Sequence, residues 1–174
     1  TGAVTEDAST STATGSISAT DADDAAAFTY SGDATGTYGA IAVDSAGAWT
    51  YTLSNSDADT TALDAGDSVT DTFTMTVSDG TASDTMDVVI TVTGADDDVS
   101  AGSDQTGAVT EDATATTATG TIAGSDADDA SSLAYTGDAT GTYGSIAVVS
   151  GSGAWTYTLS NSDADTTALD AGDS

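Results

Sequence analysis

The sequence predicts an all-β protein built from tandem antiparallel β-sandwiches, with about seven strands in each repeat. Three observations predict this class: a long internal repeat, apolar residues at every second position, and glycine-containing turn signals between the alternating runs. Alternation with a period of two places apolar side chains on one face of a strand. Several short strands of this kind within roughly 100 residues are typical of an immunoglobulin-like sandwich.

The internal repeat divides the chain into domains. The segment TGAVTEDAST at Thr1 returns as TGAVTEDATA at Thr106, and GAWTYTLSNSDADTTALDAGDS begins at Gly47 and again at Gly153. A period of about 105 residues suits an independent domain. We therefore expect a first complete repeat at 1–98, an acidic Gly/Ser linker at 99–105 and a second repeat at 106–174.

The alternating runs of the first repeat are its candidate strands. A short strand is expected at Ala3–Thr5, and the runs WTYTL, TFTMTV and MDVVITV place large apolar residues on one face and mostly Thr or Asp on the other. A single helical turn is expected in DTTALDAG, ended by Gly66. The other expected inward pairs are Ile17 and Ala19, Phe28 and Tyr30, and Ile41 and Val43.

The second repeat has no counterpart of Val69–Gln105 and so lacks its last two strands. Without them it cannot close a sandwich, and hydrogen-bonding groups and an apolar face would stay open. Two explanations are open: the sequence stops before the missing strands, or strands arrive from another chain. Because the sequence also starts inside a repeat, we expect it to be a piece of a longer protein.

The composition excludes several classes of function. The 174 residues include 29 acidic ones and no Lys, Arg, His or Cys, which gives a net charge of −29. Without cationic side chains the chain cannot neutralise phosphates, which excludes nucleic acids and anionic lipids as partners. Without His and Cys there are no Ser-His-Asp triads, zinc sites or disulfides. No apolar run approaches 18 residues, so no membrane-spanning segment is expected.

Taken together, the motifs resemble the VCBS repeat family, the bacterial cadherin-like modules of large RTX-type surface adhesins. The matching stretches are GAVTED, TGSISATDAD, YSGDATGTYGAIAVDSAGAWTYTL, TALDAGDSVTDTFTMTVSDG and VVITVTGADDD, in the order of the family. The resemblance implies a calcium-stiffened rod of sandwiches that serves as a spacer in a secreted or cell-surface adhesin, and it implies no catalysis. The family usually has Asn-Asp after the closing Thr-Gly, whereas this chain has Asp96, Asp97 and Asp98 there.

The acidic residues predict calcium binding independently of the resemblance. They gather in short runs at expected turns, and calcium prefers six to eight oxygen ligands from carboxylates, backbone carbonyls and water. Neighbouring carboxylates repel each other, and no cationic side chain is present to offset the repulsion. The predicted calcium ligands are Glu6, Asp7, Asp21, Asp23, Asp24, Asp96, Asp97, Asp98, Glu111, Asp112, Asp126, Asp128 and Asp129.

These ligands are expected to act in two groups. Glu6 and Asp7 would share one end of the domain with Asp21 and Asp23. The run 96–98 would act with Glu111, so that an ion at the junction would fix the orientation of the two repeats.

Other acidic residues have equally good local explanations. Asp57 and Asp59, repeated at Asp163 and Asp165, could bind calcium or cap the expected helical turn. Asp79 precedes Gly80 and is as well suited to a hairpin turn as to a metal. Any single Asp can also serve only to keep the surface soluble.

Three other functions would each need different features of the sequence. An enzyme would need paired carboxylates in a cleft with aromatic walls, but Trp49 and Trp155 fall at expected core positions, so no enzyme is predicted. A carbohydrate-binding module would use Tyr38 and Tyr143. A self-assembling extracellular filament of identical subunits would complete the second repeat by strand donation. The runs STSTATGS and TATTATGT could also carry O-linked glycans.

Overall fold

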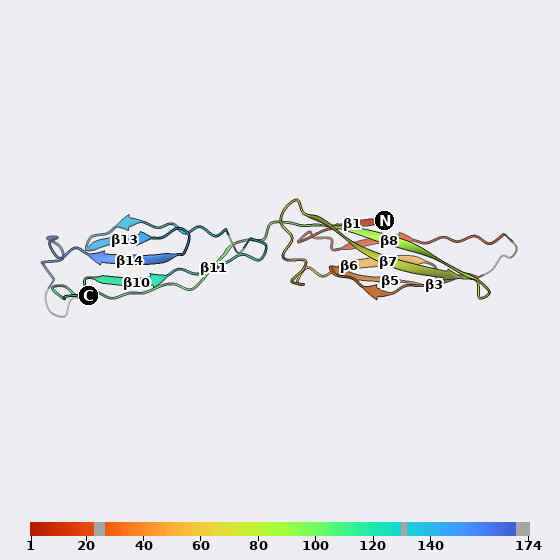
Figure 1. The fold of residues 1–174 in the computed structure, drawn as a ribbon, viewed down its shortest axis with the longest axis horizontal. Coiled ribbons are helices and arrows are strands. Elements are labelled where there is room, and N and C mark those ends of the chain that lie inside the picture. Colours follow the sequence, from red (N-terminus) through yellow and green to blue (C-terminus); the bar gives the residue numbers. More distant parts are fainter. Residues whose placement is uncertain (23–26, 130–131, 170–174) are drawn as a thin grey trace. The chain divides into compact units, whose positions relative to one another are not determined.

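The computed structural model describes residues 1–22, 27–129 and 132–169, and the chain forms two compact units (Figure 1). The first unit is Thr1–Asp97 and the second is Asp98–Ser174. Each unit is described by itself. No helix in the described ranges has the length and apolarity to cross a membrane.

The first unit is a β-sandwich of two four-stranded sheets, which confirms the predicted all-β class. One sheet has the strand order β1-β8-β7-β3 and the other β2-β6-β5-β4. The two sheets contain eight strands, whereas about seven were expected, and one of the eight, β4, has only two residues. The strands are β1 (Gly2–Thr5), β2 (Thr12–Ser16), β3 (Thr29–Ser31), β4 (Ala34–Thr35), β5 (Gly39–Val43), β6 (Ala48–Leu53), β7 (Ser68–Ser78) and β8 (Ser83–Thr93).

A long hairpin forms the centre of the first sheet. β7 and β8 pair antiparallel over eleven residues each, from Ser68 opposite Thr93 to Ser78 opposite Ser83. The prediction was of antiparallel sheets, but β1 runs parallel to β8. This short parallel strand covers the edge of β8, which would otherwise expose unpaired backbone groups.

The core lies between the two sheets and contains the residues that alternate along the strands. Trp49, Tyr51 and Leu53 of β6 are all buried, as are Phe73 and Met75 of β7. The expected period of two is therefore confirmed for the central strands. The remaining buried apolar residues of this core are Val4, Ala13, Ile17, Ile41, Leu63, Val88, Ile90 and Val92.

The predicted helical turn is wrong, because DTTALDAG forms successive turns. The Leu63 N–H donates to the Thr60 oxygen at 3.1 Å, and Gly66 has a φ of 103°. A carboxylate oxygen of Asp57 accepts a hydrogen bond from the Asp59 N–H at 3.0 Å. Such side-chain bonds compete with helical backbone bonds, and the buried Leu63 then anchors the segment to the core.

The second unit contains one complete sheet, β10-β14-β13-β12, which repeats the order β2-β6-β5-β4 of the first unit. A two-stranded sheet, β11-β9, accompanies it, and β9 lies within the predicted linker. The bounds are β9 (Ser100–Ala101), β10 (Thr117–Thr121), β11 (Gly124–Ser125), β12 (Ala139–Thr140), β13 (Gly144–Val148) and β14 (Ala154–Leu159).

The second unit has no counterpart of the sheet that contains β7 and β8 within its described residues. Residues 107–110 and 134–136 correspond in sequence to β1 and β3, but neither segment is a strand. In the first unit these two strands pair with β8 and β7, and those partners have no equivalent here. One layer of the sandwich is thus present without the layer that would cover it.

Candidate functional site

The first acidic pair lies where β1 ends, beside the end of β8. Only 2% of Glu6 is exposed, its N–H donates to the Thr93 oxygen at 2.9 Å, and one of its carboxylate oxygens accepts from the Ala95 N–H at 3.3 Å. Asp7 follows with a left-handed φ of 51°, a conformation that Asp tolerates better than most residues. This turn holds the two carboxylates at one end of the sandwich.

An amide side chain joins this pair. Asn55 Nδ2 donates to an Asp7 carboxylate oxygen at 3.4 Å, while Asn55 Oδ1 is buried without a hydrogen bond. Asp96 and Asp97 follow Ala95 directly along the chain. Oxygen-bearing side chains from two separate stretches therefore meet at this end of the first unit, and the Ala95 N–H contacts them from a third. The only indication of Asn55 in the sequence is its place beside the acidic run 57–59.

Asp21 does not join this group. It lines a cavity of about 370 Å³ together with Asp79 and Asp84, beside the turn between β7 and β8. Glu6 lies at the opposite end of that hairpin, about 30 Å away for strands of this length. The expectation that Glu6 and Asp21 share one end is therefore wrong. Asp23 and Asp24 lie outside the described residues.

The carboxylate of Asp79 accepts hydrogen bonds within its own turn. One of its carboxylate oxygens accepts hydrogen bonds from the Thr81 and Ala82 N–H groups, each at 2.7 Å. The bonds from Ala82 and then Thr81 lower the pKa of this carboxyl, because they favour its charged form. Of the two explanations offered by the sequence, the hairpin turn accounts for this residue.

The second unit holds another close acidic pair. The hydrogen bond between the Asp126 and Asp128 carboxyls is the main reason that the pKa of Asp126 is raised, because it favours the protonated form of Asp126, and burial and the charge of Asp128 add to the effect. Asp129 instead bonds to the Ser132 hydroxyl. Glu111 is half-buried and Asp112 has a φ of 55°, so the local turn of Glu6 and Asp7 is repeated.

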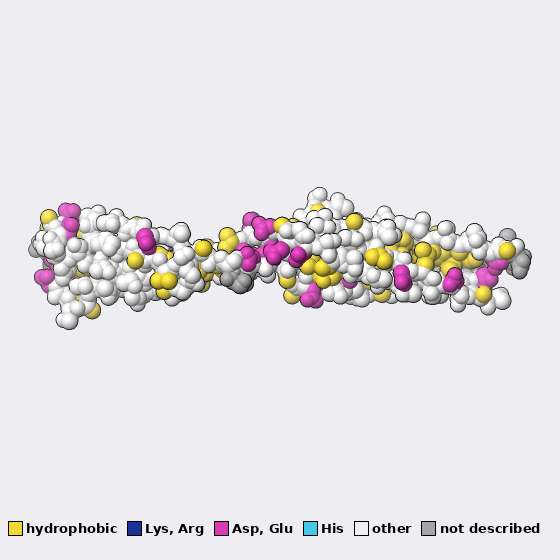
Figure 2. Space-filling view, turned by 45° about the horizontal axis from the view of Figure 1, so that its top comes forward, with side chains coloured by type: hydrophobic (Ala, Val, Ile, Leu, Met, Phe, Trp, Pro, Cys, Tyr) yellow, Lys and Arg dark blue, Asp and Glu magenta, His cyan; other side chains and the backbone are white. Residues whose placement is uncertain are grey.

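Among the predicted calcium ligands, Asp126 and Asp128 form a close pair, and Glu6 and Asp7 share one turn. Within residues 1–22, 27–129 and 132–169, no group of three or more acidic side chains is arranged to hold a metal ion. The donor chemistry of Glu6, Asp7 and Asn55 nevertheless suits calcium, which completes its shell with backbone carbonyls and water. Figure 2 shows the acidic side chains gathered in patches between stretches of uncharged surface.

The most buried carboxylate on a strand was not among the predicted site residues. Asp71 of β7 is 4% exposed and accepts three hydrogen bonds, from Thr37 N–H at 2.9 Å, Tyr38 N–H at 3.1 Å and the Tyr51 hydroxyl at 2.9 Å. We call these three donors the carboxylate cradle. The signal in the sequence was a charged residue at an inward position of β7, between Val69 and Phe73.

The cradle changes the chemistry of its phenol. Burial raises the pKa of Tyr51 above its ordinary value, and the hydrogen bond and negative charge of Asp71 raise it further. The phenol therefore stays protonated and donates, which leaves the charge on the carboxylate. In this way a buried Asp is accommodated without a cationic partner.

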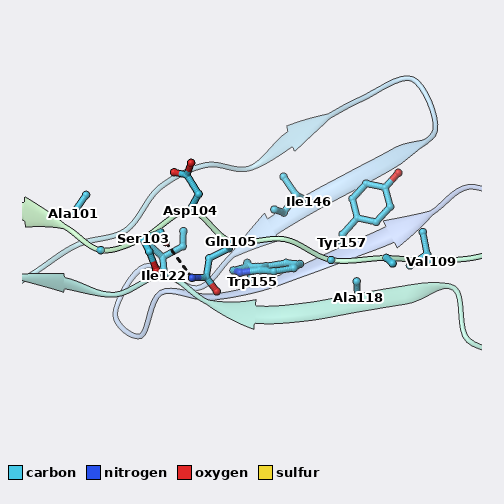
Figure 3. Close-up of a pocket in the computed structure, with 13 residues that line it drawn as sticks. Ala101, Ser103, Asp104, Gln105, Val109, Ala118, Ile122, Ile146, Trp155 and Tyr157 are labelled. Atoms are coloured by element: carbon cyan, nitrogen blue, oxygen red, sulfur yellow. Dashed lines mark hydrogen bonds between the residues drawn. The ribbon is translucent and has the colours of Figure 1, made fainter. Parts of the chain in front are cut away.

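A large open pocket lies on the uncovered face of the second unit (Figure 3). It has a volume of about 560 Å³, and Trp155 and Tyr157 of β14 both point into it. Tyr51 in the first unit has no exposed surface, whereas its counterpart Tyr157 is half-buried. The apolar floor of this pocket comprises Ala118, Ile122, Ile146 and Val109.

The aromatic residues give little support to a sugar-binding surface. Trp49 and Trp155 are 4% and 7% exposed, so both are core residues as predicted. Tyr38 packs partly buried against the core, while 43% of Tyr143 is exposed. A platform repeated in both units is therefore not formed.

The facing sheets of the first unit define it as a cadherin-like β-sandwich. The family of bacterial cadherin-like domains matches residues 1–94, more than half of the chain, and the chain belongs to this family. A search of curated proteins found no match.

Seven chains of solved structures match the protein. One of them, mouse protocadherin-24 EC1-3, has 13% sequence identity and a TM-score of 0.35. The match covers 83% of this chain and 48% of the protocadherin chain, so the present chain spans about half the length of that protein fragment.

Proposed function

We propose that the chain is part of a non-catalytic spacer array of VCBS-type repeats in a calcium-dependent bacterial surface adhesin or extracellular fibre. Membership of the bacterial cadherin-like domain family supports an extracellular, adhesion-type role. The architecture of the first unit supports a mechanical role, because its buried hydrophobic side chains form one continuous core between the two sheets. Neither His, Cys nor Lys is present to act as a catalytic base or nucleophile.

One observation carries the calcium part of this proposal. Glu6 is almost completely buried in a chain that contains no cationic side chain. A buried carboxylate is costly unless hydrogen bonds, a positive charge or a metal ion stabilise it, and calcium would add to the hydrogen bond that Glu6 accepts from the Ala95 N–H. Its position is shared by Glu111, and these are the only two Glu residues of the sequence.

Glu6, Asp7 and Asn55 would supply the side-chain oxygens for the ion in the first unit. Asp96 and Asp97 follow Ala95, whose N–H contacts Glu6, and are the next carboxylates along the chain. Bound calcium would supply the positive charge that these carboxylates lack. Extracellular modules bind calcium with a Kd of about 10⁻⁴–10⁻³ M, and at ten times Kd each site stabilises the folded state by about 1.4 kcal/mol.

Titration calorimetry of the chain with calcium and with magnesium tests this assignment. We expect calcium to bind with a Kd below about 1 mM, and Glu6→Gln to weaken the binding at least tenfold. Asp87→Asn is the matched control, because it removes the same charge from an exposed position on β8. Equal weakening by both variants would mean that calcium responds only to net charge, and the site would be refuted.

A further inference from the structure

We propose that the parallel pair of β1 and β8 is a mechanical clamp, which sets the force at which the first unit unfolds when the chain is pulled along its length. The clamp comprises Gly2–Thr5 and Ile90–Thr93, together with the bonds that Glu6 makes just beyond them (Figure 1). Its biological role rests on the proposed spacer function, because a spacer in an array is loaded through both of its ends.

The clamp joins the first and the last strand of the first unit. β1 begins at Gly2, and β8 ends at Thr93, after which the chain continues into the second unit. Tension applied at Thr1 and beyond Thr93 therefore reaches β1 and β8 before it reaches any other strand of this unit.

The direction of the two strands decides how this tension acts on the bonds between them. They run in parallel, with Gly2 opposite Ile90 and Thr5 opposite Thr93. Pulling β1 by its start and β8 by its end slides the strands past each other, so all the evenly spaced ladder bonds are loaded together. Strands that are peeled apart from one end instead lose their bonds one after another, which needs a lower force.

Further bonds extend the clamp past the end of β1. The Glu6 N–H donates to the Thr93 oxygen at 2.9 Å, and a Glu6 carboxylate oxygen accepts from the Ala95 N–H at 3.3 Å. The Gly94 N–H donates to the Asp67 oxygen at 3.0 Å, which holds the chain leaving β8 against the turn before β7. Sliding β8 away from β1 must break these bonds as well.

Close packing also holds β1 against the opposite sheet. Val4 is buried in the core. Gly2 lies so close to the opposite sheet that an added Cβ would be 3.0 Å from the Ala13 Cβ and 3.1 Å from the Trp49 ring. Releasing β1 would expose this part of the core to water, which opposes the release.

The buried Asp71 lies outside the clamp. It bonds to Thr37, Tyr38 and Tyr51, none of which belongs to β1 or β8. These bonds are still intact when β1 leaves β8. Interactions that are intact in the transition state change the equilibrium stability but leave the unfolding rate nearly unchanged. Equilibrium stability and unfolding force should therefore depend on different residues.

The direct test pulls the full chain in two directions. Because the sequence has no cysteine, Thr81→Cys adds a single attachment point in the exposed turn between β7 and β8. Single-molecule pulling between Thr1 and Ser174 loads the clamp lengthwise. Pulling between Thr1 and position 81 draws Thr1 back over its own strand, because β8 begins at Ser83, well before the residue opposite Gly2, and so β1 is peeled off.

We expect the unfolding force to be about twofold or more lower for peeling than for lengthwise pulling, because the bonds then break singly. In lengthwise pulling, rupture of the clamp frees the segment from Glu6 to Thr93, which releases about 300 Å of chain at 3.3–3.6 Å per residue. The Thr81→Cys chain pulled lengthwise is the matched control for the substitution itself.

Measurements in calcium and in chelator separate this proposal from the calcium proposal. The difference between the two directions is expected in both solutions, because the ladder bonds need no ion. A directional difference together with no effect of calcium would keep the clamp and remove the calcium proposal. Calcium binding by calorimetry without a directional difference would do the reverse.

Proline variants in β1 locate the clamp. Hydrogen-bonding residues alternate along a parallel strand, so the Glu6 bond to Thr93 places the Val4 N–H toward β8 and the Ala3 N–H away from it. Val4→Pro should lower the lengthwise unfolding force about twofold, because proline removes a ladder donor. Ala3→Pro is the matched control, since proline is tolerated where the N–H of an edge strand faces solvent. Asp71→Asn should reduce stability to denaturant while the unfolding force stays nearly unchanged.

Three results would overturn the proposal. They are equal unfolding forces in the two directions, an unchanged force in Val4→Pro, and a force lowered as much by Asp71→Asn as by Val4→Pro. Should Val4→Pro fail to fold, the comparison of directions decides the matter, because it leaves every residue of the clamp unaltered.

Discussion

At the scale of single residues, Asp71 shows how this chain buries a charge without a cation. Three donors, two of them backbone N–H groups, surround its carboxylate. Backbone donors are invisible in a sequence, so the sequence could reveal only that a charged residue occupies an inward position of a strand. The identity of its partners required the fold, because Thr37 and Tyr51 lie 34 and 20 residues away along the chain.

Removing the charge of Asp71 should destabilise the first unit strongly. Asp71→Asn replaces an acceptor with a donor among three donors, which should cost about 2–3 kcal/mol of the free energy of unfolding. Denaturant unfolding of the full chain measures this loss. A change below about 0.5 kcal/mol would show that the cradle contributes little.

The phenols of the two units should respond differently to the same change. Tyr51→Phe deletes a hydrogen bond to a charged group and should cost about 1.5–3 kcal/mol. Tyr157→Phe should cost less, because no acceptor among the described residues bonds to its hydroxyl. Equal costs would contradict the assignment of Asp71 as the partner that matters.

The raised pKa of Tyr51 makes the first unit sensitive to alkali. In the unfolded chain a tyrosine loses its proton near pH 10, whereas burial and Asp71 keep Tyr51 protonated in the fold. The resulting stabilisation is complete below about pH 10 and is lost as the pH rises toward the higher folded value. Unfolding curves between pH 8 and 12 should show this decline in the chain and a weaker decline in Tyr51→Phe.

At the scale of the elements, the sequence was most informative where one face of a strand is buried. The alternation along β6, β7 and β8 placed most of their inward residues correctly, since a period of two follows directly from strand geometry, but Met86 of β8 is 44% exposed. It failed where side chains bond to the backbone, as Asp57 does in the turns that replace the predicted helix. It could not show that β1 runs parallel to β8, because alternation carries no information on strand direction.

The contact between β2 and β6 makes a prediction at this scale. Gly15 lies opposite Trp49 in the ladder, and a Cβ on Gly15 would overlap the indole ring. Gly15→Ala should therefore lower the free energy of unfolding by about 1–3 kcal/mol through overpacking. The neighbouring exposed residue offers the control: Thr14→Ala should change it by less than about 0.5 kcal/mol.

At the scale of the whole molecule, the candidate site was only partly predictable. The sequence pointed to Glu6 and Asp7, which do lie together, but it grouped them with Asp21, which lies at the far end of the β7–β8 hairpin. The grouping fails because the β7–β8 hairpin is eleven residue pairs long, with Glu6 beside one end of it and Asp21 beside the other. The open face of the second unit could be anticipated more directly, because the given sequence contains no second counterpart of Val69–Gln105.

The central claim is that a divalent ion offsets the negative charge of this chain. Thermal unfolding of the full chain in millimolar calcium, in equal magnesium and in chelator tests it most directly. We predict that chelation lowers the Tm of the first unit by about 5–10 °C, that calcium restores it, and that magnesium restores much less. An identical Tm in chelator and in calcium would contradict the account.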